Sequence, residues 1–234
     1  MSSSQATSEA IPTVASPARL HYFEGRGLAE SVRLMLAATE TEFEFVPVTT
    51  HEAFLALRDS GRLLFGQLPL LEIDGLNLVQ SMAMVRYLAR RGHLYGATPE
   101  DAVEADMIAD SIRDALRAFT SLPFARDRTA AIDAAAAAAA KYFPRFEAIL
   151  ERAPASSVYF VGAKLTYPDV TLVELTCYAL EVLGHDVLDA YPCLAAHHAA
   201  MVALPGIAAY LASPQRYKLG DAVYVEQVNR VLGR

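Results

Sequence analysis

Residues 66–75 read Gly-Gln-Leu-Pro-Leu-Leu-Glu-Ile-Asp-Gly, and Leu78-Val79-Gln80-Ser81 follow after two residues. Pro69 opens an apolar run and cannot donate to a sheet ladder, so it predicts the first residue of an edge strand. Asp74-Gly75 lies between two short apolar runs, which is the strongest local signal of a β-hairpin. This stretch therefore predicts a strand, a tight turn and a second strand within one small unit.

The residues that flank the hairpin predict how a ligand would bind. The Leu68-Pro69 bond lies where a cis peptide is tolerated, and the Leu68 backbone could pair with the backbone of another chain, as in strand addition. Ser81 is predicted to cap a helix, whose free N–H groups and partial positive charge favour a carboxylate. We therefore expect a peptide-like ligand that is bound through its backbone.

Composition indicates a folded globular protein with a substantial core. The 234 residues are 53% apolar and carry a formal net charge of −7, which is the wrong sign for a phosphate-binding surface. Nucleic acid is therefore not expected as a partner. No stretch reaches the roughly 18 consecutive apolar residues of a membrane span. Cys177 and Cys193 form neither a CxxC pair nor a zinc spacing, which favours a reduced, cytoplasmic setting.

The first half of the chain predicts a short extension and then an α/β domain. Residues 1–17 are rich in Ser, Ala and Thr and lack the regions of a signal peptide, so we expect a disordered extension. A transit peptide is the less favoured alternative, because no arginine precedes Arg19. Residues 18–97 show the order βαβ-α-ββα of a thioredoxin-like domain. Besides the hairpin, the predicted strands and helices are 19–23, 28–38, 43–46, 51–60 and 82–91.

From residue 98 to residue 234 the long segments have helical periodicity, which predicts an all-α domain. Thr166 and Asp169 have the spacing of a capping box, and Leu165 and Val170 that of its hydrophobic staple. A final amphipathic helix over 221–232 presents Val225, Val228 and Leu232 on one face. The other predicted helices are 101–124, 130–150, one after Pro192 and one after Pro205.

Several of these pieces match one family in order and spacing. They are Leu20-His21-Tyr22-Phe23 before Arg26-Gly27, Ala29-Glu30-Ser31-Val32-Arg33, Gln67-Leu68-Pro69, Gln80-Ser81, Tyr142-Phe143-Pro144 with Phe146-Glu147, and Gly162 through Asp169. Over residues 18–234 the chain resembles the cytosolic glutathione transferases, most closely the alpha class, with some sigma-like features. The resemblance implies a homodimeric enzyme in which the glutathione thiolate attacks a small hydrophobic electrophile.

The resemblance assigns catalysis to Tyr22, whose hydroxyl would donate a hydrogen bond to the glutathione sulfur. A free thiol has a pKa of about 8.5, and lowering this pKa by about two units takes about 2.7 kcal/mol. One hydrogen bond to a charged group contributes about 1.5 to 3 kcal/mol, so Tyr22 could nearly suffice. The implied ligands of the tripeptide are Gln67, Leu68 and Pro69 at the cysteinyl backbone, Gln80 and Ser81 at the γ-glutamyl carboxylate, and Arg58 at the glycyl carboxylate.

The resemblance also implies residues that come from the partner subunit and residues that line the electrophile pocket. Asp114 and Lys141 match a partner-subunit acid and base near glutathione, although either could equally belong to a solvated helix face. Phe65 matches an aromatic key that inserts into the other subunit, and its alternative is a core phenylalanine. The candidates for the electrophile pocket are Phe23, Gly25, Phe119, Leu122, Val225 and Leu232.

One position departs from the family pattern. Relatives continue the tyrosine motif as Arg-Gly-Arg, whereas this chain has Arg26-Gly27-Leu28, and Leu28 cannot supply the second cationic donor. A glutathione-dependent peroxidase or isomerase would use the same thiolate, and a non-catalytic binder of hydrophobic ligands is the alternative that Leu28 favours. No metal is expected, because no second histidine follows His197-His198 at the i+4 spacing of a zinc site.

Overall fold

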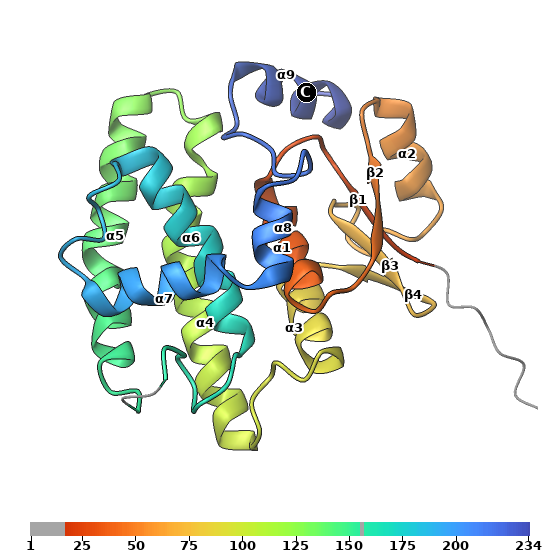
Figure 1. The fold of residues 1–234 in the computed structure, drawn as a ribbon. Coiled ribbons are helices and arrows are strands. Elements are labelled where there is room, and N and C mark those ends of the chain that lie inside the picture. The colour runs from red at the N-terminus through yellow and green to blue at the C-terminus, as the bar shows by residue number, and fades with distance from the viewer. Residues whose placement is uncertain (1–16, 155–156) are drawn as a thin grey trace, which may run out of the picture.

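A computed structural model describes residues 17–154 and 157–234 of the chain. The described residues form a four-stranded sheet with its own helices and, beside it, a larger group of helices (Figure 1). The predicted extension over residues 1–17 lies outside the described residues, apart from Pro17. The fold is the thioredoxin-like α/β domain joined to a helical domain that the sequence predicts.

The sheet has the strand order β2-β1-β3-β4. β1 (Ala18–Tyr22) pairs in parallel with β2 (Phe43–Pro47) and antiparallel with β3 (Leu70–Ile73), which pairs antiparallel with β4 (Leu76–Val79). The parallel pair requires a crossover, which the short 3-10 helix η1 (Gly27–Ala29) and α1 (Glu30–Ala38) supply. This topology confirms the predicted βαβ start of the domain.

The hairpin between β3 and β4 also forms as predicted. Asp74 and Gly75 have φ angles of 51° and 77°, which match the two left-handed residues of a type I′ turn. The prediction of an edge strand at Pro69 is wrong, because β3 is an inner strand that pairs on both sides. Pro69 is tolerated because it precedes the first ladder residue, Leu70, and its peptide bond with Leu68 is cis.

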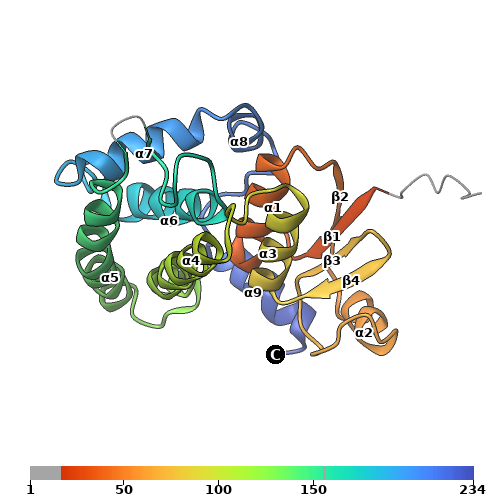
Figure 2. The ribbon, with the colours of Figure 1, turned by 90° about the horizontal axis from the view of Figure 1, so that it is seen from below.

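Helices cover both sides of this sheet (Figure 2). α1 packs beside α3 (Ser81–Arg91) on one side, and α2 (His51–Asp59) lies on the other. The Thr50 hydroxyl accepts from the N–H of Ala53 at 3.1 Å and so fixes the start of α2. Leu20, Leu70 and Leu71 of the sheet are completely buried between the helices.

The helical domain is built around α6, which packs against helices of both domains. The Asp169 carboxylate accepts from the N–H groups of Thr166 at 2.8 Å and Phe160 at 2.9 Å, so the predicted box fixes the start of α6. The predicted helix over 101–124 divides into α4 and the 3-10 helix η2 (Leu122–Phe124). The helices are α4 (Pro99–Thr120), α5 (Arg128–Leu150), α6 (Tyr167–Leu183), α7 (Pro192–Val202) and α8 (Pro205–Leu211).

The last helix, α9 (Ala222–Leu232), returns to the sheet domain and packs against α2 (Figure 1). His51 Nδ1 lies 2.9 Å from the Val231 carbonyl oxygen and joins the two helices. The predicted apolar face is only partly right, because Val228 and Val231 are buried whereas Val225 and Leu232 are partly exposed.

A membrane span is not found as a single helix anywhere in residues 17–154 or 157–234. Only α7 and α8 taken together have the length and apolar composition of a span, and they are bent by 85°.

Candidate functional site

Three segments meet at one end of the sheet. His21 of β1 lies opposite Leu70 of β3, and Leu70 also lies opposite Val79 of β4. β1 and β4 run toward this end and β3 starts from it, because β3 is antiparallel to both. Tyr22 therefore comes together at this end of the sheet with Pro69, which precedes Leu70, and with Gln80, which follows Val79.

Tyr22 is held by the turn that follows it. Its side chain is 4% exposed, and its hydroxyl oxygen accepts the backbone N–H of Leu28 at 2.9 Å. Gly27 has a φ of 42°, and a side chain there would collide with the Tyr22 hydroxyl. Only glycine lets the turn close on the phenol in this conformation.

The Tyr22 phenol keeps its proton at neutral pH. Burial raises its pKa above the ordinary value of about 10, although hydrogen bonds with the Leu28 N–H and the Tyr224 side chain partly offset this effect. A protonated phenol whose oxygen already accepts an N–H can donate its own hydrogen to an anion. Tyr22 is therefore suited to stabilise an anion, and not to act as a base.

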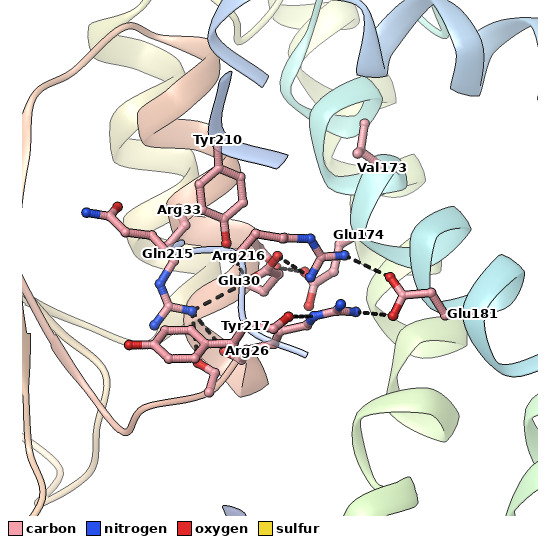
Figure 3. Close-up of polar contacts among 12 residues, drawn as sticks. Arg26, Glu30, Arg33, Val173, Glu174, Glu181, Tyr210, Gln215, Arg216 and Tyr217 are labelled. Atoms are coloured by element: carbon pink, nitrogen blue, oxygen red, sulfur yellow. Dashed lines mark hydrogen bonds and ion pairs between the residues drawn. The ribbon is translucent and has the colours of Figure 1, made fainter. Parts of the chain in front are cut away.

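The two arginines near this turn are buried, and Arg26 points toward Glu181 of α6, whereas Arg33 lies on the other side of α1 (Figure 3). Arg26 donates to the Tyr217 carbonyl at 2.5 Å and pairs with Glu181 at 2.8 Å. Arg33 donates to the Gly25 carbonyl at 2.9 Å and is 1% exposed. Leu28 thus contributes its backbone N–H at the phenol, while the Arg26 side chain ties the turn to Glu181 and to the Tyr217 carbonyl.

Tyr224, near the start of α9, was missed by the sequence reasoning. Its ring packs so closely on Gly25 that a side chain at that position would collide with it, and its hydroxyl lies beside Gly27, as the Tyr22 hydroxyl does. Burial and the neighbouring Tyr22 raise the pKa of the Tyr224 phenol. Helical spacing could have found it, since Tyr224, Val228 and Val231 follow the i, i+4, i+7 pattern of one buried face.

The start of α3 differs from the prediction by one residue. Ser81 is not the N-cap but the first residue of α3, because the backbone already turns at Gln80, where φ is 68°. The Gln80 side chain makes no capping hydrogen bond to the helix. Because the Gln80 side chain does not cap them, the first N–H groups of α3 are available to an anion beside the end of β4.

The loop before β3 carries the other predicted contacts. Leu68 is 9% exposed, whereas the Gln67 side chain faces solvent. Arg58, near the end of α2, lies beside this loop, because its Cγ is 3.8 Å from where a Gly66 Cβ would stand. Its Nε donates to Asp59 at 2.9 Å, and the side chain is 47% exposed.

The residues assigned to a partner subunit lie on the surface of this chain. The Asp114 carboxylate is 3.8 Å from Arg117, and the Lys141 ammonium lies 4.5 Å from the centre of the Tyr142 ring. α5, which carries Lys141, is on the side of the helical domain away from the sheet in Figures 1 and 2. Phe65 is 60% exposed, so it is not a core residue of its own chain.

The predicted electrophile-pocket residues do not line one cavity. A cavity of about 530 Å³ lies between Gly25 and the start of α9, with Tyr217 and Tyr224 also in its wall. Phe23 packs on Tyr22 with ring centres 4.9 Å apart, and Phe119 and Leu122 are buried. Val225 lines a separate cavity of about 470 Å³, and Leu232 is partly buried.

Three of the six histidines lie beside polar side chains. His197 Nε2 lies 3.1 Å from Asp169, His198 Nδ1 lies 2.7 Å from the Thr176 hydroxyl, and His21 Nε2 lies 2.7 Å from Glu72. No group of three or more metal-ligating side chains is found within the described part of the chain.

Comparison with known proteins identifies the family. Residues 18–90 match the family described as glutathione S-transferase, N-terminal domain, and residues 113–214 match glutathione S-transferase, C-terminal domain. Glutathione S-transferase alpha-4 of Rattus norvegicus is 37% identical over 218 residues, which cover 92% of this chain and 97% of that protein.

Solved structures agree with this match. The glutathione S-transferase of Ascaris lumbricoides has a TM-score of 0.72 at 31% identity, covering 87% of this chain and 98% of that one. Monomeric Na-GST-3, a glutathione S-transferase of Necator americanus, has a TM-score of 0.73 at 27% identity, covering 84% and 96%. The chain belongs to the glutathione S-transferase family of transferase enzymes, which use glutathione as a co-substrate.

Proposed function

We propose that this protein conjugates glutathione to small hydrophobic electrophiles and that Tyr22 is its catalytic residue. The observation that carries the proposal is the buried, protonated Tyr22 hydroxyl, set at the end of the sheet where the loop before β3 and the start of α3 also meet. The phenol would donate to the glutathione sulfur and favour the thiolate. The thiolate would then add to the electrophile or displace a leaving group from it.

The other proposed contacts match the chemistry of the tripeptide. The Leu68 backbone beside Pro69 would pair with the cysteinyl amide, with Gln67 next to it. The N-terminus of α3, with Gln80 and Ser81, would hold the γ-glutamyl carboxylate, and Arg58 would face the glycyl carboxylate. Arg58 would have to exchange Asp59 for the ligand, which its exposed position allows.

We propose that the protein works as a homodimer. Phe65 and the neighbouring Leu64 are 60% and 74% exposed, and α4 exposes Val103 and Met107, one helical turn apart, by 58% and 61%. Large exposed apolar side chains of this kind are typical of a surface that another chain covers. Phe65 would be the key of this interface, and Asp114 and Lys141 would reach the glutathione of the partner.

The electrophile would enter beside Tyr22. The cavity next to Gly25 supports this placement, with Phe23 behind Tyr22 and Tyr224 at the wall. Phe119, Leu122, Val225 and Leu232 remain predicted pocket residues. The proposed domains are 18–97 for glutathione and 98–234 for the electrophile, and the free thiols of Cys177 and Cys193 fit a cytoplasmic location.

A glutathione-affinity column followed by turnover of a chloronitrobenzene tests the proposal. The wild-type chain should be retained and should release chloride, whereas Tyr22→Phe should be retained but turn over about ten- to hundredfold more slowly. Retention without turnover would indicate a non-catalytic binder. Turnover of organic hydroperoxides alone would indicate a peroxidase.

A further inference from the structure

Arg216 ties the connection between α8 and α9 to both domains. It lies in segment 212–221, and its side chain is only 10% exposed. Its Nη1 lies 2.9 Å from Glu30 Oε1 in α1, and its Nη2 donates to Glu181 Oε1 in α6 at 3.2 Å (Figure 3). One guanidinium therefore joins this segment to a helix of the sheet domain and to a helix of the other domain.

The next residue, Tyr217, is held by the chain that follows Tyr22. Its carbonyl accepts from Arg26 at 2.5 Å, and the Arg33 guanidinium lies 5.2 Å from the centre of its ring. Arg26 also pairs with Glu181, the acid that Arg216 contacts. The segment and the catalytic turn thus share one cluster of charged side chains.

The start of α9 is tied to the α8–α9 connection, because the helix begins directly after Asp221, four residues beyond Tyr217. Further along the helix only Val228 and Val231 are buried, while His51 lies 2.9 Å from the Val231 carbonyl oxygen and Gln227 donates to Glu24 at 2.8 Å. Tyr224, in its first turn, packs on Gly25, whose carbonyl accepts from Arg33.

Charge balance favours the docked position of the segment. Glu30 is 1% exposed, and Arg33 and Tyr210 contact its Oε2, whereas Arg216 is the partner of its Oε1. Removing one partner of a buried ion pair is costly, because an uncompensated charge stays in the protein interior. Departure of the segment would remove one of the two arginines that pair with this buried carboxylate, together with the partner of Oε1.

We propose that Arg216 is a positioning residue of the transferase site: through Glu30 and Glu181 it holds the α8–α9 connection and so keeps Tyr224 beside Tyr22. The inference rests on the proposed function, since it gives the cavity next to Tyr22 a role in catalysis. Without this anchor, Tyr224 leaves the cavity wall and the Tyr22 hydroxyl. The proposed glutathione contacts at Leu68 and at the start of α3 lie elsewhere and are retained.

The first test needs no activity. The chain has no tryptophan, and Phe124 packs edge-on to Tyr224 with ring centres 5.9 Å apart, so Phe124→Trp places one fluorophore against the start of α9. In this background Arg216→Met should shift the emission to longer wavelength and increase quenching by acrylamide. Arg216→Lys should give a smaller effect, because lysine keeps the positive charge but cannot contact Glu30 and Glu181 through two separate Nη groups.

The matched control is Arg86→Met. Arg86 in α3 also bridges the domains, through Asp106 at 2.8 Å and Asp110 at 2.5 Å in α4, and within the described residues its ion pairs do not include segment 212–221. This variant should lower the melting temperature and leave the emission unchanged. Glu181→Gln, at a partly exposed acid, is the milder variant that decides the matter if Arg216→Met does not fold.

Kinetics complete the test, with Tyr224→Ala as the second change of a double-mutant cycle. Arg216→Met should lower kcat/KM for the electrophile about tenfold, change the glutathione Kd by less than about twofold, and add little to Tyr224→Ala. Unchanged emission in both Arg216→Met and Glu181→Gln, or fully additive losses with Tyr224→Ala, would overturn the proposal. If the wild type conjugates no electrophile, the proposed function fails, while the emission still decides whether Arg216 positions α9.

Discussion

Replacing Glu174 with glutamine should remove a pH dependence from the stability of the fold. Glu174 lies in α6, is 2% exposed and accepts a hydrogen bond from the Ser31 hydroxyl. Burial, and then the negative charge of Glu30, raise its pKa to about 7. Glutamine keeps an acceptor for Ser31 but cannot titrate.

The sign follows from proton linkage. Because the pKa is raised in the folded state, this group contributes stability that is fully present below the unfolded pKa of about 4.3 and is lost as the pH rises through about 7. The difference between these two pKa values corresponds to about 4 kcal/mol of unfolding free energy. Other groups act at other pH values or in the opposite direction. Glu72 and Asp106 have lowered pKa values and contribute stability above their unfolded pKa values, which is lost as the pH falls, whereas the lowered pKa of His198 adds stability as the pH rises.

Urea unfolding of both proteins at about pH 5 and about pH 8 isolates the Glu174 contribution. Protein concentration must be the same throughout, because the stability of a dimer depends on it. Between the two pH values the wild type should lose about 2 to 3 kcal/mol relative to Glu174→Gln. An equal change in the two proteins would show that Glu174 is already ionised in the folded state, and the buried-acid account would be wrong.

Three further changes test the site and the assembly. Gly27→Ala should lower both the melting temperature and turnover, because φ is 42° and the new methyl meets the Tyr22 hydroxyl; Gly61→Ala, with φ of 76° and open space around it, is the control that should leave turnover unchanged. Phe65→Ala should weaken the proposed dimer by about 3 to 5 kcal/mol in a sedimentation series, and a monomeric wild type would refute the interface. Leu28→Arg should move the pH profile of conjugation toward acid, since the Leu28 side chain is 38% exposed and has room for a guanidinium; an unmoved profile would mean that this position does not face the sulfur.

Much of the fold could be predicted because its signals are local. The Asp74-Gly75 turn and the Thr166-Asp169 box each specify a structure within a few residues, and both form as predicted. The errors also have local causes. Pro69 does not mark an edge strand, because it stands just outside the ladder of an inner strand. Ser81 is not the N-cap of α3, because the backbone turns one residue earlier, at Gln80.

The parts of the site that the sequence did not reveal depend on contacts between distant segments. Tyr224 reaches the turn after Tyr22 across about two hundred residues of chain, and Arg216 meets Glu30 over a similar separation. Helical spacing can mark Tyr224 as part of a buried face, but it names neither the partner of Tyr224 nor that of Arg216, since each pairing arises from the way the last segment returns to the sheet domain. The sequence prediction for Leu28 concerned its side chain, whereas in the structure its backbone N–H donates to the Tyr22 hydroxyl. Any residue but proline could supply that N–H.

The ultraviolet absorbance of the thiolate in the glutathione complex, followed against pH in the wild type and in Tyr22→Phe, tests the central claim most directly. One donated hydrogen bond of about 1.5 to 3 kcal/mol should lower the thiol pKa by about one to two units, to about 6.5 to 7.5, and Tyr22→Phe should return it toward about 8.5. The same midpoint in both proteins would contradict the role of Tyr22 as the donor to sulfur.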